Sequence, residues 1–240
     1  MAEQVTFGEV QVIAHRGASR AERENTLDAF AAAGRMGADA VELDVRRTSD
    51  GVLVVHHDPR LADGGVIAEL RSTELPVQMP RLGDALDACR GMWVNVEIKN
   101  DPTEPDFDPT DSMADATMEL LVARGEHDRW LISSFRIETV DRCREIAQRL
   151  GVPIRTAWLT VAVPDDVVGL LTARGHVALH PWVQLLGRHV VEQCRAAGIA
   201  VNTWTCDDPE RMAELVEWGI DGICTNVPDV ALSVLGRPPA

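Results

Sequence analysis

Aromatic residues are scarce in this sequence. It has no tyrosine, and only six tryptophans and four phenylalanines among 240 residues. A protein that stacks nucleic-acid bases needs exposed aromatic rings, so base stacking is not expected. Basic residues are also few, because the chain has 23 of them against 38 acidic residues, which gives a net charge of −15. Repulsion argues against binding to nucleic acid and against a stable association with anionic membranes.

Long apolar runs are missing as well. No stretch approaches the roughly 20 apolar residues of a membrane span, and the start at Met1 lacks the basic and apolar segments of a secretion signal. We therefore expect a cytoplasmic protein. The five cysteines are scattered and form no Cys-x-x-Cys pair, which argues against a disulfide framework and against a zinc site.

No linker or low-complexity segment divides the chain, so residues 1–240 are predicted to form a single domain. Nothing in the sequence indicates an oligomeric state. Short apolar, β-branched runs recur along the chain, each followed by an amphipathic stretch. The predicted strands are Val10–Ala14, Ala40–Val45, Trp93–Ile98, Trp130–Ser134, Arg155–Leu159, Val177–His180, Ala200–Trp204 and Gly222–Thr225, with Leu53–His57 as an additional short run.

Helical patterns separate these runs. They cover Thr26–Met36, a stretch after Leu82, Met113–Ala123, Ile137–Leu150, Pro164–Ala173, Arg188–Ala197, Pro209–Trp218 and Pro228–Leu235. Asp208 before Pro209 is a typical helix start, and glycines such as Gly151 and Gly219 follow helical runs as stops. Eight βα units in a chain of this length predict a closed (β/α)₈ TIM barrel. An open doubly wound sheet is the main alternative, but no Gly-x-Gly-x-x-Gly or Walker pattern follows the first strand.

Catalytic groups of such barrels lie at the C-terminal ends of the strands, and charged residues interrupt two of the predicted strands there. Because strand side chains alternate, Glu42 and Asp44 share one face, and so do Glu97 and Lys99. Their apolar neighbours must pack under the helices, so the charged residues face the barrel interior. Buried carboxylates need compensation, and an all-oxygen set of Glu42, Asp44 and Glu97 suits a divalent metal cation, Mg²⁺ or Ca²⁺.

An alternative without a metal remains open. Lys99, Arg16 and Arg46 could neutralise the three carboxylates as ion pairs. Arg16 and Lys99 are also candidates for binding phosphoryl oxygens inside an otherwise acidic protein, and Arg46 is the weaker candidate. The acidic loop Asn100–Asp111 follows a strand at the same end of the barrel and is either a solvated connection or a wall of the cleft.

Two histidines, His15 and His57, end runs at this same end and are the candidates for proton transfer. Cleavage of a phosphodiester needs one group that accepts a proton and one that donates a proton. His56 is one residue out of phase with His57, so we expect it to face away. His180 also ends a strand at this end and stays in consideration.

Several short motifs follow one another along the chain. They are His15-Arg16-Gly17, Glu24-Asn25-Thr26, Glu42-x-Asp44, Thr48-x-Asp50-Gly51 with His57-Asp58-Pro59, Glu97-Ile98-Lys99, Ser133-Ser134-Phe135, Asn202-Thr203-Trp204-Thr205 and Gly219-x-Asp221-Gly222. In this order and spacing the chain resembles the glycerophosphodiester phosphodiesterase family over nearly its whole length. The resemblance implies a hydrolase that splits a small-molecule glycerophosphodiester substrate into glycerol 3-phosphate and an alcohol.

The resemblance also implies roles for individual residues. Glu42, Asp44 and Glu97 would bind the metal, and His15 and His57 would act as general base and general acid. The glycerol hydroxyl would attack phosphorus, and water would open the resulting cyclic phosphate. Arg16 and Lys99 would add positive charge, Asn25 would orient part of the site, and Trp204 would pack against the glycerol carbons or fill the barrel mouth.

One motif departs from the family pattern. Relatives often have Thr-Asp-x-Pro where this chain has Thr225-Asn226-Val227-Pro228. The segment Asp58–Arg81 is short, so a large cap over the site is not expected. Two other functions remain as alternatives: a lysophospholipase D-type phosphodiesterase, which would need an exposed apolar channel, and a non-catalytic barrel that binds a phosphoester.

Overall fold

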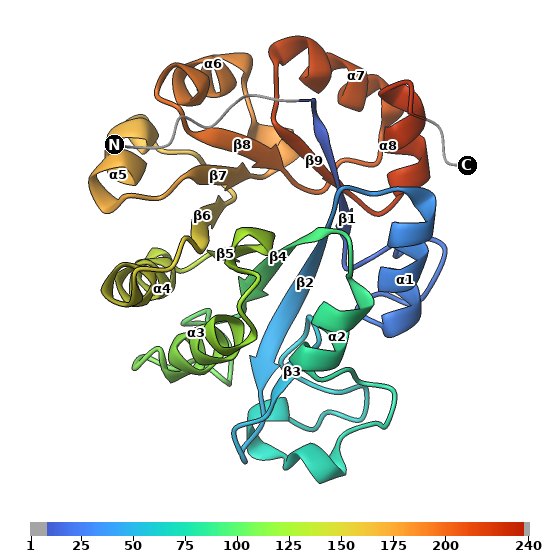
Figure 1. The fold of residues 1–240 in the computed structure, drawn as a ribbon, viewed down its shortest axis with the longest axis vertical. Helices are drawn as coiled ribbons and strands as arrows, with labels where there is room; N and C mark the ends of the chain where they lie inside the picture. Colours follow the sequence, from blue (N-terminus) through green and yellow to red (C-terminus); the bar gives the residue numbers. More distant parts are fainter. Residues whose placement is uncertain (1–8, 238–240) are drawn as a thin grey trace.

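The computed structural model describes residues 9–237. Eight parallel strands form a closed barrel, and helices surround it (Figure 1). Strand β1 pairs with both β2 and β9, and this double pairing closes the sheet into a barrel. The predicted (β/α)₈ TIM barrel is therefore confirmed, and the open doubly wound sheet is excluded.

The barrel strands lie close to the predicted runs. They are β1 (Gln11–His15), β2 (Ala40–Arg47), β4 (Trp93–Ile98), β5 (Trp130–Ser134), β6 (Arg155–Thr160), β7 (Ala178–Pro181), β8 (Ala200–Thr203) and β9 (Gly222–Thr225). The helices are α1 (Leu27–Met36), α2 (Leu82–Ala88), α3 (Ser112–Arg124), α4 (Ile137–Leu150), α5 (Val167–Arg174), α6 (Arg188–Ala196), α7 (Pro209–Trp218) and α8 (Pro228–Val234). Helix α5 begins at Val167 rather than at the predicted Pro164, whereas Asp208 caps α7 as expected.

Side-chain alternation along β2 fixes the two faces of the barrel wall. Val41, Leu43 and Val45 are completely buried and belong to the same apolar cluster as Phe30 of α1 and residues of α2. Burial of each such side chain stabilises the fold by roughly 1.5–3 kcal/mol, so a shift of register by one residue is strongly disfavoured. The residues between them, including Glu42 and Asp44, consequently face the barrel interior.

The additional run forms strand β3 (Leu53–Val55), which lies outside the barrel. Strand β2 continues past the barrel wall, and β3 returns antiparallel to it, with Val55 opposite Val45. The return brings the chain back to the barrel mouth, where the backbone N–H of His56 donates to the carbonyl of Asp44 at 3.0 Å. His57 therefore reaches the site from a hairpin rather than from a barrel strand.

The segment between β3 and α2 contains two short 3₁₀ helices, η1 (Ile67–Glu69) and η2 (Ser72–Glu74). In Figure 1 it lies at the periphery of the barrel beside β3. Two features anchor this segment. The side chain of Ile67 is completely buried, and the N–H of Val55 donates a hydrogen bond to the carbonyl of Pro80 at 2.9 Å. The segment forms a side wall of the barrel. A large cap over the site was not expected from its short length.

Two features of the sequence have simple counterparts in the structure. All five cysteines are buried as free thiols. Within residues 9–237, no helix combines the length and the apolar character that crossing a membrane requires.

His180 on β7 lies inside the barrel and is only 3% exposed. Its Nε2 is 3.0 Å from Nδ2 of Asn202, which donates the hydrogen bond. Burial, with the nearby charge of Arg155 as a smaller cause, lowers the pKa of His180 to about 3. A neutral imidazole is therefore expected throughout the neutral range, and its recorded hydrogen bond is to Asn202.

Acidification should destabilise the fold through His180. In the unfolded chain its imidazole binds a proton near pH 6.5, whereas the folded protein keeps it neutral down to about pH 3. Below pH 6.5 the unfolded state binds more protons, so the free energy of unfolding falls, by about 1 kcal/mol per such group at pH 5.5. Urea unfolding at pH 7.5 and 5.5 should show a loss about 1 kcal/mol larger in the wild type than in His180→Gln. Equal losses would contradict this account.

Candidate functional site

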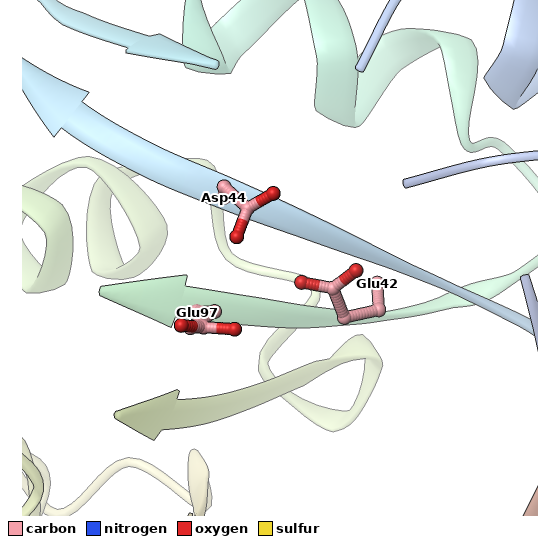
Figure 2. Close-up of side chains that lie close together, drawn as sticks. All are labelled: Glu42, Asp44 and Glu97. Atoms are coloured by element: carbon pink, nitrogen blue, oxygen red, sulfur yellow. The ribbon is translucent and has the colours of Figure 1, made fainter. Parts of the chain in front are cut away.

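Three carboxylates meet at the C-terminal end of the barrel. Glu42 and Asp44 come from β2 and Glu97 comes from β4, and their side chains converge in Figure 2. One oxygen from each lies within 4.8 Å of the others. Their exposed fractions are 4%, 1% and 7%, so all three are buried. The structure brings together the three residues that the sequence singled out as metal ligands.

Two cations approach this cluster. Nε of Arg16 lies 3.2 Å from Oδ2 of Asp44, and Nζ of Lys99 lies 2.8 Å from Oε1 of Glu97 and 3.5 Å from Oδ1 of Asp44. Lys99 is thus shared by Glu97 and Asp44, whereas Arg16 pairs with Asp44 and, at 3.0 Å, with the exposed Glu24. The geometry leaves a cluster in which three carboxylates share two positive charges.

Arg46 does not take part in this neutralisation. Its guanidinium, which is completely buried, pairs with Glu104 at 2.9 Å and with Asp106 at 2.6 Å. Its Nε also donates to the backbone carbonyl of His57 at 2.8 Å. The alternative in which Arg46 helps to neutralise the three carboxylates is excluded, because the acidic loop after β4 supplies its partners instead.

The pKa values follow this uneven distribution of charge. Burial alone would raise the pKa of Asp44, but the charges of Lys99 and Arg16 lower it to about 2. Burial and the neighbouring negative charges raise the pKa of Glu42 well above its usual range. Burial also raises the pKa of Glu97, in spite of the ammonium of Lys99. Glu42 is therefore the carboxylate whose negative charge is least compensated.

The hydrogen bonds of Glu42 indicate the same lack of compensation. Oε1 of Glu42 is buried and has no hydrogen-bond partner among the described residues, while Oε2 accepts the backbone N–H of Arg16 at 3.0 Å. A buried acceptor without a partner costs about 1–3 kcal/mol, and a divalent cation would remove that cost. The set of carboxylate oxygens fits a hard cation, and Glu42, Asp44 and Glu97 are the residues that would hold it.

The turn after β1 depends on a glycine. Gly17 has a φ of 82°, and a Cβ at this position would lie 2.6 Å from the backbone of Ala29. Only glycine fits there, so the chain turns sharply after Arg16, whose own φ of 56° is also left-handed. This turn aims the backbone N–H of Arg16 at Glu42.

Asn25 contacts the carboxylate cluster through Asp44. It is 5% exposed, and its Nδ2 donates to Oδ2 of Asp44 at 2.7 Å. It is not among the residues that line the central cavity described below. Its contact orients a carboxylate, which agrees with the expected orienting role more closely than with direct contact to a substrate.

His15, at the end of β1, is held by an amide. Its Nδ1 lies 2.7 Å from Oδ1 of Asn226, whose Nδ2 donates to Asp207 at 2.6 Å. The second contact fixes the orientation of the amide, so Oδ1 accepts from the imidazole and Nδ1 carries the proton. Nε2 is then free to accept a proton. Burial and the charge of Arg16 lower the pKa of His15, which favours the neutral form.

His57 has a carboxylate partner instead. Its Nδ1 lies 2.7 Å from Oδ1 of Asp58, and this hydrogen bond lowers the pKa of Asp58. The contact holds the imidazole ring of His57 through Nδ1. His56 contacts a backbone oxygen, with Nδ1 at 2.9 Å from the carbonyl of Asp58, and it is not among the residues that line the central cavity described below.

The two histidines face one cavity of about 140 Å³. Its wall also includes Arg16, Glu42, Glu97, Lys99, Phe135, His180 and Trp204. The indole Nε1 of Trp204 donates to the carbonyl of His180 at 2.9 Å, which holds the ring in the cavity wall. The structure therefore places every predicted site residue in or beside this cavity.

Three residues at the site were not assigned a role from the sequence. Phe135 packs edge-on against Trp204 with 5.3 Å between ring centroids, and it is 37% exposed. Asn226 and Asp207 hold His15. The sequence does contain a signal for Asp207. Helix α7 needs one carboxylate as its N-cap and uses Asp208, so the neighbouring Asp207 is available for another contact.

The loop after β4 forms part of the surroundings of the site. Asp101 and Glu104 line a shallow pocket of about 220 Å³ together with Lys99 and Phe135. Of the two possibilities that the sequence left open, the structure favours a wall of the cleft. Arg46, through Glu104, fastens this wall to the hairpin that carries His57.

Comparisons with known proteins agree with this geometry. A glycerophosphodiester phosphodiesterase of Caldanaerobacter subterraneus is 27% identical, over 94% of this chain and 98% of that protein. A phosphodiesterase of Oleispira antarctica, solved with the product sn-glycerol-3-phosphate, is 28% identical with a TM-score of 0.84, over 94% of this chain and 96% of that one. A glycerophosphodiester phosphodiesterase of Thermotoga maritima is 27% identical with a TM-score of 0.78, over 96% and 99% of the two chains.

The family model of the glycerophosphoryl diester phosphodiesterases matches residues 15–230, a span that contains both histidines and all three buried carboxylates. The chain belongs to the glycerophosphoryl diester phosphodiesterase family and is an enzyme of that class.

Proposed function

We propose that this enzyme hydrolyses small glycerophosphodiesters to glycerol 3-phosphate and an alcohol, with a divalent cation and two histidines as its catalytic groups. One observation carries the proposal: three buried carboxylates lie within 4.8 Å of one another, and two of them, Glu42 and Glu97, line the same cavity as His15 and His57. The barrel accounts for the described residues 9–237, which supports a single working domain.

Glu42, Asp44 and Glu97 would hold the cation, either Mg²⁺ or Ca²⁺. When bound, it would neutralise charge on the phosphodiester and make the attacking hydroxyl more acidic. Arg16 and Lys99 belong to the same cavity wall and would bind the phosphoryl oxygens with fixed positive charge.

The hydrogen-bond partners of the histidines support a division of roles. His15 has a neutral amide on Nδ1 and a free Nε2, the arrangement of a base that takes the proton of the glycerol hydroxyl. His57 has a carboxylate on Nδ1, which holds the ring, so that Nε2 would give its proton to the leaving alcohol.

The reaction then runs in two steps. The glycerol hydroxyl next to the phosphoester loses its proton to His15 and attacks phosphorus, and the bond from phosphorus to the head-group oxygen breaks as His57 protonates that oxygen. Water subsequently opens the cyclic phosphate, with the two histidines in exchanged roles. Phe135 and Trp204 supply the apolar surface in this cavity against which the glycerol carbons would pack.

Turnover should depend on a divalent cation. Exhaustive chelation is expected to abolish hydrolysis of glycerophosphocholine, and Mg²⁺ or Ca²⁺ should restore it. By calorimetry, Glu42→Gln and Glu97→Gln should each lower cation affinity at least about tenfold. Glu145→Gln, at an exposed position of α4, serves as the control and should leave the affinity unchanged. Full activity after chelation would refute the metal assignment.

The neighbouring glycerol hydroxyl should be essential. An analogue of the substrate in which hydrogen replaces this hydroxyl loses its internal nucleophile, so we expect hydrolysis to slow by at least about 100-fold. Release of the alcohol can be measured for both compounds under saturating cation. An analogue cleaved at the normal rate would show that water attacks phosphorus directly.

Each histidine should matter for turnover, but in different ways. Substitutions His15→Ala and His57→Ala should each lower kcat by about 10²–10⁴-fold. A nitrophenyl diester has a leaving group that departs without a proton, so it should rescue His57→Ala and not His15→Ala. The four combinations of variant and substrate can be compared in steady-state assays. Equal rescue of both variants would refute the division of roles, and the opposite pattern would reverse it.

A further inference from the structure

The position of the proton on the ring of His15 is decided at Nδ1. This nitrogen lies 2.7 Å from Oδ1 of Asn226, whereas Nε2 lies 3.9 Å from Oε2 of Glu42, beyond hydrogen-bond distance. In a neutral imidazole one ring nitrogen carries the proton and the other accepts, and the hydrogen bond made by one nitrogen sets the state of the other. The side chain of Asn226 therefore determines whether Nε2 of His15 is free to take a proton.

An amide can meet its neighbour in two ways, because a half-turn exchanges its oxygen and its nitrogen. When the oxygen of Asn226 faces His15, Nδ1 of the ring donates and Nε2 keeps a lone pair. When the nitrogen of Asn226 faces His15, Nδ1 must accept and the ring proton moves to Nε2. A general base needs the lone pair on the nitrogen that faces the reaction, so only the first orientation serves the proposed mechanism.

Asp207 favours the first orientation. Nδ2 of Asn226 donates to Oδ2 of Asp207 at 2.6 Å, and an ionised carboxylate can only accept hydrogen bonds. After a half-turn, the amide oxygen would face this carboxylate, acceptor against acceptor. The hydroxyl of Ser19 also lies near the amide, 2.9 Å from Oδ1 of Asn226 and 2.8 Å from the carbonyl of His15. A hydroxyl can donate or accept, so Ser19 is compatible with both orientations.

The carboxylate of Asp207 is itself held in place. Its Oδ1 accepts the backbone N–H of Asn226 at 2.8 Å and the hydroxyl of Thr225 at 2.9 Å. Asp207 belongs to the loop after β8, is exposed to solvent and meets Asn226 across 19 residues of sequence. It is not among the residues that line the central cavity. Its effect on the reaction must therefore pass through Asn226.

We propose that Asp207 is a positioning residue, which sets the tautomer of His15 through the amide of Asn226. The inference rests on the proposed function for the role of His15 as base, but the tautomer is a property of the enzyme alone. It also explains why the two side chains belong together. An amide at position 226 needs an acceptor beside it, whereas a carboxylate there would present oxygen on both sides and need no orienting partner.

The substitution Asp207→Asn should reverse the amide of Asn226. Two donors, from Thr225 and from the backbone of Asn226, face Oδ1 of Asp207, so the oxygen of the new side chain keeps that place and its nitrogen replaces Oδ2. Two amide nitrogens would then face each other, and a half-turn of Asn226 relieves this. We expect kcat to fall by about 10²–10⁴-fold, as for the loss of a general base. The nitrophenyl diester should show the same loss.

The tautomer can be observed directly by ¹⁵N NMR of histidine-labelled enzyme with saturating Mg²⁺. Protonated and unprotonated ring nitrogens differ widely in chemical shift, and spectra at about pH 8.5 report on neutral imidazole. The signals of His15 are those that disappear in His15→Gln. We expect the proton on Nδ1 in the wild type and on Nε2 in Asp207→Asn. A wild-type ring with its proton on Nε2 would overturn the proposal without the need for any variant.

A second substitution should rescue the first. In Asp207→Asn combined with Asn226→Asp, the carboxylate at position 226 accepts from Nδ1 of His15 whichever way it turns. The ring proton should return to Nδ1, and kcat should rise at least about tenfold above that of Asp207→Asn. Asp208→Asn is the matched control, because it removes the same charge one residue away and asparagine caps a helix about as well as aspartate. It should change neither kcat nor the tautomer.

The outcomes separate this inference from the proposed function. Thermal unfolding should confirm that the variants are folded, since Asp207 and Asp208 are exposed. An unchanged tautomer in Asp207→Asn would overturn the role of Asp207, whether kcat stays at the wild-type level or falls through a structural effect, and would leave the proposed function intact. A tautomer that moves to Nε2 while kcat is unchanged would support the control by Asp207 and refute His15 as the base.

Discussion

The interior of the barrel carries more negative charge than its own cations neutralise, and the site is organised around this imbalance. Glu42, Asp44 and Glu97 are buried together, whereas Lys99 pairs with Asp44 and Glu97, and Arg16 is divided between Asp44 and the exposed Glu24. The cost appears as the raised pKa of Glu42 and as its unpartnered oxygen. Burial of such a cluster costs free energy, and apolar packing elsewhere in the fold must offset that cost. The apolar face of β2, packed against α1 and α2, contributes to this packing.

The two histidines at the cavity differ in the partners that hold their rings. An amide, oriented by Asp207, holds His15, and a carboxylate holds His57. Both contacts use Nδ1, so Nε2 is the ring nitrogen that each histidine would use on the proposed mechanism. Asn226, where the chain departs from the motif expected for the family, is the residue that holds one of these two rings.

Local sequence patterns were sufficient to predict the barrel and the carboxylate cluster. Period-two alternation places Glu42 and Asp44 on one face, and helix starts and stops such as Asp208 and Gly219 mark the βα units. The partners of Arg46 and His15 could not be predicted in this way. Arg46 pairs with acids in a loop 58 and 60 residues away, and His15 contacts Asn226 across 211 residues, so both contacts exist only once the barrel has closed.

Closure also explains why the residues of the site are held in two different ways. The carboxylates and His15 are carried by barrel strands, where a shift in register would remove the core packing. His57 follows the β3 hairpin, and its backbone carbonyl accepts a hydrogen bond from Arg46 at 2.8 Å. Because the same guanidinium pairs with Glu104 and Asp106, the position of His57 depends on ion pairs with a loop as well as on its own hairpin. The carboxylates are therefore fixed by the register of the sheet, whereas His57 is fixed by contacts that form only after the loop has folded against it.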